Sequence, residues 1–230
     1  MRLTALLTLV PFLLAAGAKA QEGPVVVEMF TSQGCSSCPP ADAFFAELSA
    51  REDVIALALH VDYWDYLGWK DKFADPAFSA RQRAYAAAEG KQMVYTPQMI
   101  VDGQTRVIGN RPADVDALVA RHSADANAVA VGLARTESGL TVSATARRAL
   151  DTPLSVQLVR YLPERVVEIT HGENAGRTLR YSNIVTHWSE IARWDPRAPL
   201  SIDVTAPADA HVAVIVQQPG HGAILGAAAD

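Results

Sequence analysis

VVVEMFTSQGCSSCPPAD, residues 25–42, joins an apolar run, a short polar turn, a Cys-x-x-Cys pair and two prolines. The nearly continuous apolar run at 25–30 is typical of a strand that is buried on both faces. Prolines are tolerated in the first turn of a helix, whose amides lack helical partners in any case. We therefore predict a strand, a turn that carries the cysteines, and a helix with Phe44, Phe45 and Leu48 on one side.

Strands and helices continue to alternate up to about residue 126. Residues 54–61 (VIALALHV) form a second apolar run, so that strand, helix and strand make a right-handed βαβ unit. Further along we expect a helix at 76–89 and a two-stranded hairpin of 98–102 with 105–108. A last helix is expected to begin at Pro112. This part of the chain is predicted to be α/β, with a mixed sheet flanked by helices.

From about residue 127 the spacing of apolar residues changes from the helical period to a period of 2, which is that of a strand. Alternating segments recur at 129–135, 140–146, 154–161, 201–205 and 212–218. We therefore predict that 21–126 is the α/β domain and that 127–230 is a small antiparallel β domain, sandwich-like in architecture.

The chain begins with the three-part pattern of a secretory signal peptide. Met1-Arg2 is a short basic start, residues 3–16 are apolar, and Ala18-Lys19-Ala20 has small residues at the two positions that a signal peptidase recognises. A membrane anchor is the alternative, but the apolar run is shorter than the roughly 20 residues that span a bilayer. We expect residues 1–20 to be removed, no transmembrane segment to remain, and a periplasmic or secreted location.

Composition describes a mildly acidic globular protein. Cleavage would remove Arg2 and Lys19 but no acid, which leaves 18 basic and 25 acidic residues and a formal charge of −7. The sequence contains no basic patch that would predict binding to nucleic acid or to an anionic membrane. The two cysteines lie three residues apart, and a bridge that closes so small a loop stabilises a fold by roughly 2 kcal/mol at most. A redox role explains the pair better than a structural one.

The cysteine pair suits thiol–disulfide exchange. At a helix N-terminus, unpaired amides and the helix dipole stabilise the thiolate of Cys35. Cys38 is expected one turn further into the helix, within bonding reach but more shielded. Cys35 would attack a substrate disulfide, and Cys38 would then resolve the mixed disulfide. The pair is itself the redox group, so no cofactor is predicted.

Two further positions are candidates for this chemistry. A carboxylate in an apolar strand costs several kcal/mol unless it is paired or neutralised, so a buried Glu28 would accept the proton of Cys38. The alternative is a glutamate at a strand edge that faces water. Pro97 opens the next strand, which in a sheet that resembles that of thioredoxin would run antiparallel to the first and begin at the same sheet edge as the cysteines. We predict a cis Thr96–Pro97 bond that sets the Thr96 backbone beside the disulfide, where it would hydrogen-bond an extended substrate.

Residues 62–71 (DYWDYLGWKD) follow the second parallel strand and are rich in aromatic side chains. Ligands of open α/β sheets lie beyond the carboxyl ends of the strands, so this loop is expected to flank Cys35. The two tryptophans and two tyrosines of this loop could form a substrate-binding wall, in which Tyr63, Trp64 and Trp69 are the candidate site residues. A hydrophobic lid that packs on the core or on the β domain explains the same residues equally well.

Metal binding is the chemical alternative. Two cysteines and a nearby histidine would suit copper(I), which thiolates select, and His60 ends the second strand near the cysteines. The six histidines show no metal-ligand spacing, however, and a buried strand histidine is more often a core residue. We predict no metal site.

The chain resembles the thioredoxin superfamily over residues 24–122 and, more closely, the exported bacterial proteins grouped as domain of unknown function 1223. It departs from ordinary thioredoxins in the glycine before the first cysteine, the serines between the cysteines and the inserted aromatic loop. The matching blocks are VEMFTSQGCSSCPPAD (27–42), HVDYWDYLGWKD (60–71), RQRAY (81–85), VYTPQM (94–99), GEN (172–174), NIV (183–185) and ILGA (224–227).

The resemblance implies a thioredoxin-like fold in the first half. It also implies Cys35 as nucleophile and Cys38 as resolving thiol, with Pro97 as the cis proline after Thr96 and Glu28 as the buried acid. The leading hypothesis is an extracytoplasmic thiol–disulfide oxidoreductase that acts on protein cysteines and exchanges electrons with a further redox partner. The alternatives are a copper-binding thioredoxin-like protein and a non-catalytic binding module.

Overall fold

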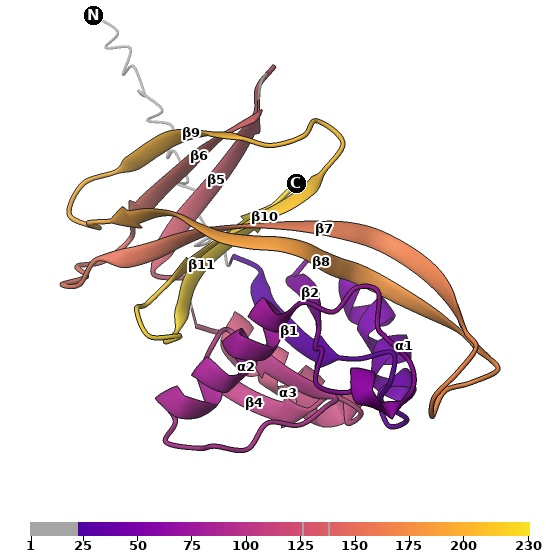
Figure 1. Cartoon of the computed structure of the whole chain (residues 1–230). Helices are drawn as coiled ribbons and strands as arrows, with labels where there is room; N and C mark the ends of the chain where they lie inside the picture. Colours follow the sequence, from indigo (N-terminus) through magenta and orange to yellow (C-terminus); the bar gives the residue numbers. More distant parts are fainter. Residues whose placement is uncertain (1–22, 126, 138) are drawn as a thin grey trace, which may run out of the picture.

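The computed structural model describes residues 23–125, 127–137 and 139–230 (Figure 1). The predicted signal peptide, residues 1–20, lies outside the described residues. No helix in the described ranges combines the length and the apolarity needed to cross a membrane. In chain order the elements are β1 (Val25–Thr31), α1 (Pro39–Ser49), β2 (Val54–His60), the 3-10 helix η1 (Asp65–Leu67), α2 (Pro76–Ala88), β3 (Gln98–Val101), β4 (Thr105–Ile108), α3 (Pro112–Ser123), β5 (Val129–Arg135), β6 (Gly139–Ala146), β7 (Leu154–Ile169), β8 (Arg177–Trp194), β9 (Leu200–Thr205), β10 (His211–Gln217) and β11 (Ile224–Ala229).

The strands form a large mixed sheet and a small one, which confirms the expected α/β class. The large sheet has eight strands in the order β11-β10-β7-β8-β2-β1-β3-β4, and the small one has three in the order β5-β6-β9. β1 runs parallel to β2 and antiparallel to β3. β8 joins the first half of the chain to the second through a parallel contact with β2, where Ala58 faces Ile184.

Both halves therefore contribute strands to one sheet. The small sheet packs against β7, β10 and β11 of the large sheet. The two sheets share an apolar cluster that includes Val142, Val156 and Val214 (Figure 1). The division of the chain into two domains, 21–126 and 127–230, stays a prediction.

The faces of β1 decide where the polar side chains of the site point. All seven β1 residues are buried, and successive side chains of a strand point to opposite faces. Val27 and Met29 pack in the cluster of α1 and α3, whereas Val26 and Phe30 pack in the cluster of α2. The odd-numbered positions of β1 therefore face α1, and the even-numbered positions face α2.

The long hairpin of β7 and β8 is the largest departure from the sequence-based expectation. β8 was not predicted, and β7 continues eight residues beyond the predicted end at Tyr161. Much of this hairpin extends beyond β2 and over α1 (Figure 1). Its burial pattern is irregular, with Val166 53% exposed, so the apolar and polar residues do not alternate as they do in a half-buried strand.

Candidate functional site: the Cys35–Cys38 loop

Cys35 and Cys38 form a disulfide in the turn between β1 and α1, with their Cα atoms 5.4 Å apart. Cys38 is the N-cap of α1 and not, as predicted, a residue one turn inside it, because Pro39 and Pro40 occupy the first two helical positions. Its carbonyl accepts hydrogen bonds from the amides of Ala41 and Asp42 at the start of the helix. Cys35 lies ahead of the helix in the preceding turn.

The Thr96–Pro97 segment lies against this disulfide. Its peptide bond is cis, as predicted, and the Sγ atom of Cys35 lies 3.8 Å from the carbonyl oxygen of Thr96. The sheet register explains the approach, because β3 runs antiparallel to β1 with Gln98 opposite Phe30. The structure thus brings together four of the predicted site residues.

The aromatic loop flanks the cysteine turn, as expected from its place after β2. The indole nitrogen of Trp64 donates to the hydroxyl of Thr96 over 2.7 Å, and that of Trp69 donates to Oε1 of Gln33 over 2.8 Å. A Cβ atom at Gly34 would lie 3.2 Å from the backbone oxygen of Trp64 and 3.3 Å from its Cβ, so the glycine lets the Trp64 main chain come close to the cysteine turn. Both tryptophans are partly buried and brace the loop.

Tyr63 lies beside Trp64, with 5.6 Å between ring centroids, and also reaches α2. Its hydroxyl donates to Gln82 of α2 over 3.0 Å, and burial raises its pKa to about 12. The aromatic residue that is open to solvent here is Tyr66, which is 76% exposed and stacks on Trp64 with 6.4 Å between ring centroids. Tyr66 is one of the two tyrosines of the predicted wall, although it was not among the three residues named as site candidates.

The turn at 170–176, between β7 and β8, holds the cysteine loop from the other side. The amide of Asn174 donates to the carbonyl oxygens of Gln33 and Cys35, over 2.9 Å in each case. The amide of Ser36 donates to Glu173 over 3.3 Å. With these contacts Cys35 is only 5% exposed and Cys38 is fully buried. The GEN block at 172–174 was noticed in the sequence, but nothing in its composition indicated this role.

Glu28 is fully buried, as predicted, but its carboxylate is occupied. Arg81 of α2 donates to it from two nitrogens, over 2.6 and 2.8 Å, and the hydroxyl of Tyr85 donates to it over 2.5 Å. Burial raises the pKa of Tyr85, which keeps its hydroxyl protonated as a donor. Glu28 is an even-numbered β1 residue and so lies on the α2 face, opposite α1. Its role as a proton acceptor stays a prediction.

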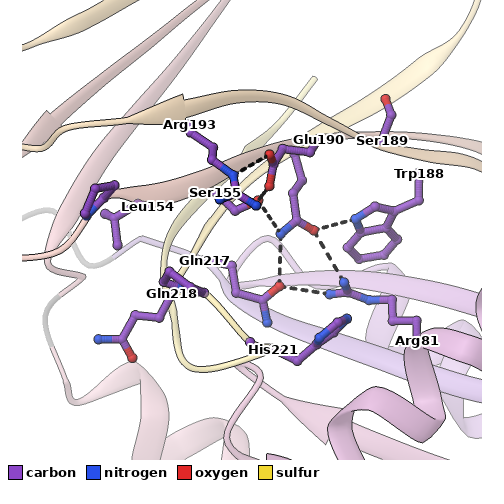
Figure 2. A pocket seen from close by; sticks show the side chains of 14 residues that line it. Arg81, Leu154, Ser155, Trp188, Ser189, Glu190, Arg193, Gln217, Gln218 and His221 are labelled. Carbon is purple, nitrogen blue, oxygen red and sulfur yellow. Dashed lines mark hydrogen bonds and ion pairs between the residues drawn. The ribbon is translucent and has the colours of Figure 1, made fainter.

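Arg81 also forms part of a cavity on this α2 face, shown in Figure 2. The cavity measures about 500 Å³ and lies between α2, β7, β8 and the β10–β11 turn. The guanidinium carbon of Arg81 lies 3.8 Å from the ring centroid of Trp188, whose indole donates to Gln157 over 2.6 Å. Gln217 accepts a further hydrogen bond from Arg81. The charge at the floor of the cavity is thus already paired.

A second group of polar side chains lies on the α1 face, where β1 ends at Thr31 and β2 ends at His60. Thr31 donates to Asp42 Oδ1 over 2.8 Å, and His60 Nδ1 lies 2.7 Å from Asp71 Oδ2. Asp71 also accepts from the amide of Gln33 in the cysteine loop. Burial, the largest influence, raises the pKa of Asp42 to about 7. Asp42 and Asp71 stood in the matching blocks but were given no role.

His60 is the histidine that the copper hypothesis would use. It is fully buried, and its Nδ1 atom is engaged with Asp71. In the described ranges no three or more His, Cys, Asp or Glu residues are grouped so that they could hold a metal ion.

Fold and site together define a mixed α/β protein with a disulfide at a strand–helix junction beside a cis proline. The chain belongs to the family described as protein of unknown function (DUF1223), whose family model matches residues 26–217. This confirms the resemblance to that family.

Two solved structures are similar to this chain. Protein AGR_C_4864 from Agrobacterium tumefaciens is 31% identical, with a TM-score of 0.78 over 91% of this chain and 95% of that one. HBP35 of Porphyromonas gingivalis is 16% identical, with a TM-score of 0.60 over 91% of this chain and 75% of that one, which shows a shared fold alone. A search of curated proteins found no match.

Proposed function

We propose that this protein is an extracytoplasmic thiol–disulfide oxidoreductase that uses Cys35 and Cys38 on protein cysteines. The observation that carries the proposal is the position of Cys35 Sγ, 3.8 Å from the carbonyl oxygen of Thr96, next to the cis Pro97. A thiolate at this place would attack a substrate disulfide while the Thr96 backbone binds the extended substrate chain.

The arrangement of the first half supports a thioredoxin-like fold. The strand order β2-β1-β3-β4, with one parallel and two antiparallel pairings, has α1 and α3 on one face and α2 on the other. This is the arrangement implied by the thioredoxin resemblance. The predicted signal peptide at 1–20 supports a periplasmic or secreted location. Disulfides form and persist in such oxidising environments.

The burial of the pair favours a second candidate function. With 5% of Cys35 and none of Cys38 exposed, the disulfide also suits a non-catalytic binding module in which it only fixes the loop. In the redox proposal the turn at 170–176 must loosen before a macromolecular disulfide can reach Cys35. The aromatic wall of Trp64 and Tyr66 would then border the entrance.

Reactivity of the disulfide distinguishes the two candidates. We expect the oxidised protein to be reduced by millimolar dithiothreitol without denaturant, and the reduced protein to be reoxidised by glutathione disulfide. A C38A variant, expressed with its signal sequence, is expected to trap mixed disulfides with periplasmic proteins, and the C35S/C38A double variant is the matched control. A disulfide that resists reduction in the native state, together with no adduct that depends on Cys35, would overturn the redox proposal in favour of the binding module.

A further inference from the structure

Three buried side chains meet under the first turn of α1, and each has a polar atom without a hydrogen-bond partner. These atoms are Asp42 Oδ2, His60 Nε2 and the hydroxyl of Tyr181. The rings of His60 and Tyr181 are in edge contact, 4.9 Å between centroids. Buried polar groups without partners are uncommon and call for an explanation. Here His60 and Tyr181 lie near the carboxyl of Asp42, which stands four residues after Cys38 in the chain.

The carboxyl of Asp42 is held so that one oxygen stays free. Thr31, an odd-numbered β1 residue that faces α1, donates to Oδ1 over 2.8 Å and leaves Oδ2 unbonded. Asp42 lies one helical turn after Cys38, and its amide donates to the Cys38 carbonyl over 3.0 Å. Side chains four residues apart share a helix face, and both residues are buried, with Asp42 4% exposed. A buried carboxyl therefore lies on the same side of the helix as the inner thiol.

The groups that face Asp42 come from three other elements. Burial has the largest effect on the pKa of Asp42 and raises it. His60 of β2 lowers the pKa of Asp42, whereas Asp71 of the aromatic loop raises it. Tyr181 of β8 senses the charges of Asp42 and Asp71, and burial keeps its hydroxyl protonated by raising its pKa. With a pKa of about 7, Asp42 can either take up or release a proton near neutral pH.

We propose that Asp42, on the α1 face, is the proton acceptor of Cys38, and that Thr31 and the His60–Asp71 pair position its carboxylate. This inference rests on the proposed function. In the step, Cys35 is bonded to a substrate sulfur in a mixed disulfide. The Cys38 thiol gives its proton to Asp42 Oδ2, and the resulting thiolate attacks Cys35 Sγ. The Cys35–substrate bond breaks, and the substrate sulfur leaves as a thiolate that takes a proton from solvent. The two protein thiols are oxidised and the substrate disulfide is reduced.

Stopped-flow reaction of the reduced protein with dithiobis-nitrobenzoate reads the two thiols separately. Attack by Cys35 releases the first thionitrobenzoate, and attack by Cys38 on the mixed disulfide releases the second. We expect D42N to leave the first release unchanged and to slow the second at least about tenfold near pH 7, as loss of a general base does. The deficit should shrink toward pH 9, where hydroxide removes the thiol proton. E47Q, which replaces an exposed carboxylate of the same helix, is the matched control.

A second variant tests the positioning role if D42N folds poorly. The hydrogen bond from Thr31 lowers the pKa of Asp42, so T31V should move the pH inflection of the second release upward. A wild-type protein that gives no first release, with this reagent or with glutathione disulfide, would refute the proposed function itself. A normal first release with an identical second release in D42N, or a loss of the pH inflection in E28Q but not in D42N, would overturn the inference alone.

Discussion

Replacing Asp42 by asparagine should remove a pH-dependent cost to folding. Burial raises the pKa of this carboxyl from its ordinary 3.8 to about 7 in the folded protein. The folded state therefore keeps the proton to a higher pH than the unfolded chain does. The free energy of unfolding must fall as the pH rises from about 4 through about 7, and then level off.

The size of this effect follows from the pKa values. A tenfold difference in proton affinity is worth 1.36 kcal/mol, so a rise from 3.8 to about 7 corresponds to a loss of about 4 kcal/mol above neutral pH. The asparagine side chain carries no charge at any pH in this range. It can still accept the hydrogen bond from Thr31 through its carbonyl oxygen, so the variant keeps the local contact while losing the titration.

Urea denaturation of the oxidised protein at several pH values between 4.5 and 9 measures this effect. The useful quantity is the stability of D42N minus that of the wild type, because other titrating groups cancel in it. One of them is Asp102, whose pKa burial raises to about 6. We expect the difference to grow with pH up to about 7 by a few kcal/mol and then stay constant. A difference that does not change with pH would show that Asp42 is not a buried carboxyl held near neutrality.

Three further substitutions test the contacts around the site. R81M leaves the buried Glu28 carboxylate without a cationic partner and should cost about 3–5 kcal/mol in urea denaturation. Equal stability of R81M and R81M/E28Q would argue against this account. N174A removes the two hydrogen bonds that Asn174 donates to the cysteine loop, so dithiothreitol should reduce the disulfide several-fold faster, and an unchanged rate would mean that these bonds do not limit access. T96V removes the acceptor of the Trp64 indole and should cost about 1–3 kcal/mol, whereas a neutral result would show that the indole finds water instead.

The first half was predictable because local sequence and tertiary structure agree there. The apolar runs of β1 and β2 are buried along their whole length, and Pro39, Pro76 and Pro112 begin the three helices. Each signal is local, so neighbouring residues are enough to find it. The position of Thr96 beside Cys35 needed more than local signals, namely the antiparallel pairing of β3 with β1 that the resemblance to thioredoxin implied.

The 170–176 turn could not be predicted in the same way. Its partners lie about 140 residues away in the chain, and Asn174 acts through backbone carbonyls, which leave no trace in the side chains of the partner segment. β8 shows no clear period because its two faces meet different surroundings along its length. A single sequence therefore shows the GEN block but does not show that it contacts the cysteine loop.

The alternation of side chains along β1 explains why Glu28, although close in sequence to the cysteines, lies on the face opposite α1. Side chains of β1 that face α1 stand at odd-numbered positions, and in Val25–Thr31 the odd positions are apolar except for Thr31. β1 itself thus offers no carboxylate on the side where α1 begins. Glu28, one position out of phase, faces α2 and is bound by Arg81. In the proposed step the acid for Cys38 comes from α1 itself, as Asp42, with the Thr31 hydroxyl as its hydrogen-bond partner on β1.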